Sequence, residues 1–155
     1  TTIEVLIPDM DGREELLDII LEAGPDIVGH NLETVRRLTP AVRSRAKYDT
    51  SLKTLRYIAC RGAVAKSGLM LGLGESEDEI LASLDDLADA GVSIVTMGQY
   101  LQPTAKHLPV QEYVTPGQFE WFGDMARFRG FSYVASAPLV RSSYMAEQAL
   151  HGIGK

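Results

Sequence analysis

The amino-acid sequence predicts an α/β domain built on a parallel β-sheet. Three observations support this fold class: short β-rich or apolar runs alternate with amphipathic helical segments, the units recur at the roughly 30-residue spacing of βαβ units, and most helical segments end at a glycine. The 155 residues are 45% hydrophobic and 23% charged, which suits one domain that buries a core. We expect a single domain over 1–155, with strand-helix units over 1–114 and a C-terminal helix, strand and RSSY tail over 115–155.

The first two strand-helix units follow one another from the start of the chain. Residues 3–8, IEVLIP, are expected to form a strand because they are rich in β-branched and aliphatic side chains. Residues 13–23 place apolar side chains on one helical face and stop at a glycine, which predicts a helix. The pattern repeats in a strand expected at 26–29 and a helix expected at 51–61.

The third unit contains the most informative stretch of the sequence, KSGLMLGLGESEDE. An apolar strand at 67–71 ends in a glycine-rich turn, and Ser76 with Glu79 forms the capping-box pattern that begins a helix at 77–90. The unpaired backbone N–H groups of this helix start are expected beside the glycines, where a ligand could approach the backbone. Residues 92–97 are expected to form the next strand.

The last part of the chain continues the alternation. A long, proline-bearing loop at 102–115 is expected to act as a lid or a substrate-contacting segment. A threonine cap, Pro116 and the capping-box residue Gln118 begin a helix at 115–129. A final β-rich run at 131–140 leads into RSSYMAEQAL.

Composition and charge exclude several classes of protein. The net charge of −6 and the pI near 5.0 give no reason to expect nucleic acid. No apolar run is long enough to cross a membrane and no signal peptide begins the sequence, so we expect the cytoplasm or an organelle matrix. The single cysteine, Cys60, excludes an internal disulfide and any cysteine-only metal site made by this chain alone. A local basic cluster suits a small anionic partner and comprises Arg36, Arg37, Arg43 and Arg45.

Polar residues and glycines follow the expected strands at the point where each strand ends. The carboxyl ends of parallel strands share one edge of a sheet or barrel, and ligands bind there. The sequence therefore predicts a binding site at that edge. These residues are Asp9, His30, Asn31, Glu33, Gly72, Gly74, Glu75, Gln99 and Tyr100.

Two motifs resemble those of radical S-adenosylmethionine (SAM) barrels. Gly68-x-Met70-x-Gly72-x-x-Glu75 resembles the glycine motif on the fifth barrel strand, and HNLET at 30–34 resembles the ribose-contacting strand end of biotin synthase. A larger set of matches covers essentially the whole chain and resembles the lipoyl synthase family. It comprises VLIPD at 5–9, GHNLETVRRLTP at 29–40, KSGLMLGLGE at 66–75, GQYLQPT at 98–104, KHLPV at 106–110 and PLVRSSY at 138–144.

The resemblance implies a partial (β/α) TIM barrel of the radical SAM type, with this chain as the C-terminal half-barrel plus a C-terminal extension. It also implies a sulfurtransferase that inserts two sulfur atoms at C6 and C8 of a protein-bound octanoyl-lysine by 5′-deoxyadenosyl radical chemistry. Such an enzyme uses SAM and two 4Fe-4S clusters, and its substrates are octanoylated lipoyl domains or the glycine-cleavage H protein. The cluster-binding cysteine motifs are absent and Cys60 matches no family ligand, so the chain is expected to need a missing N-terminal half and to be inactive alone.

The resemblance also assigns site residues. Asn31 and Glu33 would hold the SAM ribose, and Arg45 would bind the SAM carboxylate through its guanidinium fork. Three glycines would let the cofactor pack against backbone. They are Gly68, Gly72 and Gly74. No catalytic side chain is assigned.

The C-terminal RSSY motif supplies the expected metal ligand. Ser142 matches the serine ligand of the family's auxiliary 4Fe-4S cluster, and Ser143 is the adjacent alternative. Arg141 could position the chain terminus or contact the surroundings of that cluster.

Other interpretations stay open at this point. Glu33 could pair with Arg36 or Arg37 on the same helical turn, and His30 is more often a structural residue than a ligand. The chain could be a cluster-free SAM-binding protein or pseudoenzyme. It could also be a phosphate-handling barrel aldolase or isomerase in which Lys66 forms a Schiff base, although nothing in the sequence marks that lysine as desolvated.

Overall fold

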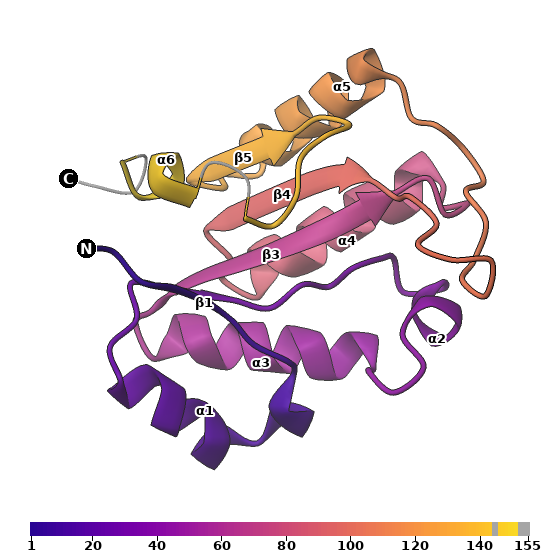
Figure 1. Ribbon diagram of the computed structural model, residues 1–155. Coiled ribbons are helices and arrows are strands. Elements are labelled where there is room, and N and C mark those ends of the chain that lie inside the picture. The colour runs from indigo at the N-terminus through magenta and orange to yellow at the C-terminus, as the bar shows by residue number, and fades with distance from the viewer. Residues whose placement is uncertain (144–145, 152–155) are drawn as a thin grey trace.

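The computed structural model describes residues 1–143 and 146–151. Five parallel strands form one sheet in the order β1-β2-β3-β4-β5, which confirms the predicted α/β class and is consistent with part of a barrel (Figure 1). The strands are β1 (Glu4–Leu6), β2 (Ile27–Gly29), β3 (Val64–Leu71), β4 (Ile94–Gln99) and β5 (Tyr133–Ser136). The helices are η1 (Met10–Gly12), α1 (Glu14–Glu22), α2 (Thr39–Val42), α3 (Tyr48–Cys60), α4 (Glu77–Asp89), α5 (Pro116–Phe128) and α6 (Ala146–His151).

The main core lies between one face of the sheet and the long helices. Leu69 and Met97 of the central strands pack in one buried cluster with Leu55 of α3, Leu84 of α4 and Phe119 of α5. Burial of such apolar surface is the main favourable term in folding. The long helices α3, α4 and α5 therefore cover one face of the sheet.

The opposite face of the sheet is covered by α6 where the strands begin, and by the segment after β5 at Gly98 near the end of β4. Side chains alternate along a strand, so Ile94 points away from its neighbour Val95 in the main core. Ile94 packs with Ile27 of β2 and with Ala149 of α6 in a second buried cluster. Between these two contacts, Gly68 of β3 and Thr96 of β4 line a cavity on this face.

Several element boundaries differ from those expected. Strand β3 begins at Val64 and not at residue 67, and β4 covers Ile94–Gln99 and not 92–97. Helix α3 begins at Tyr48 and not at residue 51, because the Tyr48 hydroxyl donates to Asp86 Oδ2 of α4 at 2.8 Å and lies 3.1 Å from Ser83 Oγ. Strand β5 ends at Ser136 and not at residue 140, because the chain then crosses over the end of β4, where Gln99 N donates to Pro138 O at 3.1 Å. No helix in the described ranges is long and apolar enough to cross a membrane.

Candidate functional site

A cavity of about 410 Å³ lies at the carboxyl ends of β2, β3 and β4, within the size range of small-ligand sites. Asn31 and Glu33 line it from the segment after β2, Gly68 from β3 and Thr96 from β4. Ser142, after β5, closes another side. The cavity therefore lies at the edge of the sheet where the polar strand ends predicted a site.

The segment after β2 is held in place by β3. Glu33 N donates to Gly68 O at 3.0 Å, and Met70 N donates to Glu33 O at 2.8 Å. Glu33 adopts φ +70°, a left-handed conformation that is uncommon for a residue with a side chain. This backbone path places the Asn31 and Glu33 side chains, two residues apart, in the same cavity.

Burial raises the pKa of the Glu33 carboxyl group above its usual value, while the hydrogen bond with Asn31 and the charge of Arg43 act in the opposite direction. A buried carboxylate costs free energy unless it receives hydrogen bonds or a positive partner. Glu33 is therefore prepared to accept hydrogen bonds from a polar ligand in this cavity.

A chain of hydrogen bonds fixes Arg43 beside Glu33. Arg43 Nη1 donates to Ser51 Oγ at 2.9 Å, and Ser51 Oγ lies 2.7 Å from His30 Nε2. Desolvation lowers the pKa of His30, so its ring is neutral at pH 7, and His30 Nδ1 lies 2.9 Å from Ile7 O. His30 is thus a hydrogen-bonded structural residue that orients Arg43.

Arg45 lies elsewhere. It lines a separate cavity with Arg36, Arg43, Lys47 and Tyr48, whereas Arg43 also lines a third cavity, together with Asn31 and Glu33. The geometry therefore brings Arg43, and not Arg45, next to the two residues predicted to hold a ribose. The sequence pattern included Arg43 in the basic cluster but gave no signal that separated it from Arg45, two residues away.

The three glycines predicted to contact a cofactor have different neighbours. A methyl group at Gly68 would lie 2.8 Å from Thr96 Oγ1 and 3.0 Å from Asn31 Oδ1, so Gly68 keeps the cavity floor open. A methyl group on Gly72 would lie 2.4 Å from Glu112 O, and Gly74 faces Gln111. Gly72 and Gly74 therefore accommodate the chain at 111–112.

Glu75 occupies the backbone donors of the glycine turn. Its carboxylate accepts from Gly72 N at 2.5 Å and from Leu73 N at 2.9 Å. The Glu75 carboxylate therefore occupies the backbone N–H groups of Gly72 and Leu73. These two N–H groups are not available to a phosphate.

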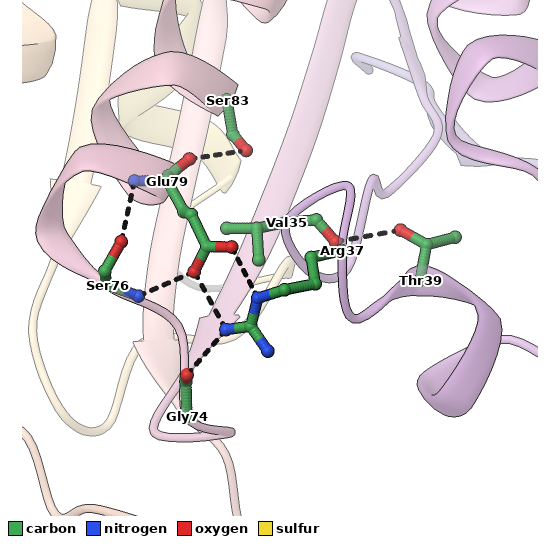
Figure 2. A network of polar contacts seen from close by, with 7 residues as sticks. All are labelled: Val35, Arg37, Thr39, Gly74, Ser76, Glu79 and Ser83. Carbon is green, nitrogen blue, oxygen red and sulfur yellow. Dashed lines mark hydrogen bonds and ion pairs between the residues drawn. The ribbon is translucent and has the colours of Figure 1, made fainter.

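A polar network anchors the start of α4 to the segment after β2 (Figure 2). Ser76 and Glu79 form the predicted capping box, and Glu79 accepts from Arg37 Nε at 2.7 Å. The hydrogen bond from Arg37 lowers the pKa of Glu79 to about 2. Arg36 donates to Asp49 Oδ1 at 2.7 Å, so neither arginine forms the ion pair with Glu33 that one interpretation of the sequence allowed.

The loop at 102–115 is fastened near its C-terminal end. The Gln99 side chain donates to Glu112 O at 3.0 Å and accepts from Val114 N at 2.9 Å, and the Tyr100 hydroxyl donates to Leu108 O at 2.8 Å. Residues 101–103 line the cavity. The start of the loop forms part of the cavity rim, which suits the predicted substrate-contacting segment.

The RSSY motif begins at the cavity wall. Ser142 lines both the main cavity and a neighbouring cavity of about 240 Å³, whereas Ser143 lines only the latter. Arg141 Nη1 donates to Val140 O at 2.7 Å. Tyr144 lies outside the described residues.

Lys66 is buried, which the sequence did not indicate. Its side chain is 3% exposed and its Nζ lies 2.6 Å from Glu4 Oε1. The amine that a Schiff base needs is therefore already engaged by a carboxylate within the protein. The pair disfavours the aldolase interpretation.

Cysteine thiolates for an iron-sulfur cluster are not brought together here. Cys60 is exposed at the end of α3, and residues 1–143 and 146–151 contain no group of three or more His, Cys, Asp or Glu side chains placed to hold a metal ion. A cubane cluster requires about four such ligands. The described residues do not fit one.

Comparison with protein families and curated proteins gives a consistent result. Residues 1–98 match the radical SAM superfamily. The chain is 60% identical over 148 residues to the lipoyl synthase of Parabacteroides distasonis, a match that covers 96% of this chain and 53% of that protein. It is 55% identical to the mitochondrial lipoyl synthase of Nematostella vectensis over 97% of this chain and 52% of that protein.

Solved structures show the same fold at low sequence identity. A domain of pyruvate-formate lyase-activating enzyme from Bacteroides vulgatus superposes with a TM-score of 0.65 at 13% identity, covering 84% of this chain and 80% of that chain. A radical SAM methyltransferase from Kitasatospora setae, with cobalamin and a 4Fe-4S cluster bound, gives 0.52 at 16% identity, covering 61% of this chain and 19% of that chain.

Proposed function

Because the chain belongs to the radical SAM superfamily and matches curated lipoyl synthases over nearly its whole length, we propose that it is the C-terminal portion of a lipoyl synthase. The chain spans about half the length of these curated relatives. The complete activity therefore needs residues beyond this half. The expected compartment, the cytoplasm or an organelle matrix, stays a prediction.

One observation carries the proposal for the cofactor: Asn31 and Glu33 face the same cavity at the carboxyl edge of the sheet. When bound, SAM would supply the 5′-deoxyadenosyl radical. The Glu33 carboxylate would accept hydrogen bonds from ribose hydroxyls, and the Asn31 amide would donate one. The open floor at Gly68 leaves room for the cofactor to lie against β3.

The carboxylate group of SAM also needs a cationic partner, and that partner must lie close to Asn31 and Glu33. Arg43 is half-buried beside Glu33 and is oriented by Ser51, so it is the arginine whose position suits that role. Arg45, the residue expected from the sequence, would have to leave its own cavity to do so.

The described residues do not bring together the thiolates that the two 4Fe-4S clusters need. We propose that both clusters are held chiefly by the other part of the enzyme. Ser142 remains the proposed oxygen ligand of the auxiliary cluster, with Ser143 as the alternative; Ser142 is half-buried at the main cavity, whereas Ser143 is exposed. The reaction proposed is sulfur insertion at C6 and C8 of octanoyl-lysine on a lipoyl domain or H protein.

The test joins this chain to the upstream part of a curated relative and measures SAM binding by calorimetry. Asn31→Ala and Glu33→Gln each remove hydrogen bonds to a buried polar ligand, and about 1–3 kcal/mol per site predicts roughly 5- to 150-fold weaker binding. Glu77→Gln, an exposed carboxylate at the start of α4, is the matched control.

Unchanged SAM affinity in both site variants would remove these residues from the cofactor site. The cluster-free alternative makes a different prediction for the 155-residue chain by itself. That chain would bind SAM without the upstream part and yet hold no stoichiometric iron and sulfide after anaerobic reconstitution.

A further inference from the structure

The cavity that Arg45 lines has a volume of about 330 Å³ and lies between α2 and the start of α3, among positively charged side chains. Four of its lining residues are cationic: Arg36, Arg43, Arg45 and Lys47. We call these residues and their cavity the basic pocket. No carboxylate is among the residues that line it in the described part of the chain. The whole protein, in contrast, carries a net charge of −6.

Two of the four cations already have partners within the protein. Arg36 donates to Asp49 at 2.7 Å and lies over the Tyr48 ring at 4.3 Å, so it is held in one position at the pocket wall. Arg43 donates to Ser51 Oγ.

The other two cations, Arg45 and Lys47, are exposed. Arg45 and Lys47 have no hydrogen bond or ion pair from their side chains to any residue in 1–143 or 146–151. Their charges are available to an external anion, and the fixed guanidinium of Arg36 lies beside them.

The position of the basic pocket relates it to the proposed cofactor site. Arg43 lines the basic pocket on one side and, on the other, the cavity that also contains Asn31 and Glu33. A substrate chain attached to a protein must enter near these cavities, so the surface of its carrier would lie over this edge of the sheet. Complementary charge at such an edge guides approach and fixes orientation.

We propose that the basic pocket binds carboxylate side chains on the surface of the protein that carries the acyl substrate. This inference rests on the proposed function. Arginine forks bind carboxylates through paired hydrogen bonds, and Lys47 adds a mobile point charge at the rim. Arg36, Arg45 and Lys47 are exposed, so the basic pocket is open to the protein surface. An open site of this kind suits binding of an acidic protein surface better than binding of a small anion, which needs an enclosed site.

The experiment measures binding of a fluorescently labelled octanoylated lipoyl domain to the 155-residue chain by anisotropy at low salt. The double variant Arg45→Glu/Lys47→Glu should bind at least about 10-fold more weakly, and the difference should shrink at high salt because exposed charges are screened. Lys53→Glu/Arg56→Glu reverses the same number of charges on the exposed face of α3 and should stay within about twofold of the parent.

The outcomes separate this proposal from the proposed function. Equal weakening by both double variants would assign the effect to net charge alone and overturn the pocket, as would no weakening by either. Inorganic phosphate that displaces the domain at micromolar concentration would assign the pocket to a free anion. Failure of the unmodified 155-residue chain to bind the lipoyl domain would also overturn the proposal for the basic pocket. None of these results affects the test of SAM affinity with Asn31→Ala and Glu33→Gln.

Discussion

At the scale of single residues, Glu33 shows how the site departs from what stability alone would favour. Its backbone is left-handed, and its carboxyl group is buried with a raised pKa. Both features cost free energy and persist because β3 holds the segment through two backbone hydrogen bonds. Strain and burial at one cavity-facing residue are typical of a ligand site.

Glu33→Gln should therefore stabilise the isolated chain at neutral pH. The folded-state pKa is raised, so the folded protein binds more protons than the unfolded one just above pH 4.5, and stability is lost as the pH rises through that window. The gain should be present at pH 7.5 and absent near pH 4. Thermal unfolding should show a rise of roughly 2–4 °C, the shift that about 1 kcal/mol gives in a chain of this size.

Glu77→Gln supplies the comparison, since that carboxylate is exposed at the start of α4. A lower melting temperature for Glu33→Gln at pH 7.5 would mean that the carboxylate makes internal interactions that outweigh its burial.

The sequence predicted the site residues whose positions follow from where the parallel strands end. It did not predict the residues whose place in the site depends on the direction of a side chain. Asn31, Glu33 and Gly68 come together because two neighbouring parallel strands end at one edge. Arg43 and Arg45 lie in an irregular segment with no periodicity, and the hydrogen bond to Ser51, eight residues away, orients one of them. No local pattern encodes such a contact.

At the scale of elements, the crossing after β5 depends on the absence of a side chain in β4. A methyl group at Gly98 would lie 2.0 Å from Val140 O, so the segment that leads to Ser142 can pass only over a glycine. This contact sets the shape of the cavity wall.

Gly98→Ala should displace that segment and destabilise the chain by about 1–3 kcal/mol, the usual cost of overpacking. Urea unfolding measures the loss, and hydrogen exchange should show weaker protection at Ala137 and Gln99, whose N–H groups bond across the crossing. Gly117→Ala is the control, because a methyl group there meets only Thr115 Oγ1, at 4.0 Å. Equal stability of the two variants would show that the crossing adjusts without cost.

Element starts were predictable where capping residues are local, and less so elsewhere. Both predicted capping boxes, Ser76 with Glu79 and Thr115 with Gln118, are present. The four-residue α2 and the short η1 were not expected, because such short turns carry no hydrophobic period. The η1 turn packs against α3, where Thr54 Oγ1 donates to Asp9 O at 2.6 Å, and Arg43, directly after α2, donates to Ser51 Oγ of α3 at 2.9 Å.

At the scale of the whole molecule, the sheet has an open edge at β1. This strand pairs with β2 on one side, and its other edge is unpaired within the described residues. Leu6 on β1 is 60% exposed. An exposed strand edge with apolar side chains favours pairing with another chain.

The isolated chain should therefore associate as its concentration rises. Analytical ultracentrifugation should show this, and Leu6→Lys should reduce it because a lysine on an edge strand opposes pairing. Ile19→Lys changes an equally exposed apolar residue on the outer surface of α1 and should leave association unchanged. A stable monomer at high concentration would contradict the prediction.

The sequential order of the five strands has a consequence for how the polypeptide acquires its shape. Each strand pairs with the strand made just before it, so no pairing waits for a distant segment to be synthesised. As the chain emerges from a ribosome, β1 and β2 can meet first, and each later crossover adds one strand to an existing edge. Local pairing of this kind lowers the entropy cost of closing each loop. The growing edge moves steadily toward β5, while the outer edge of β1 stays unpaired within the described residues.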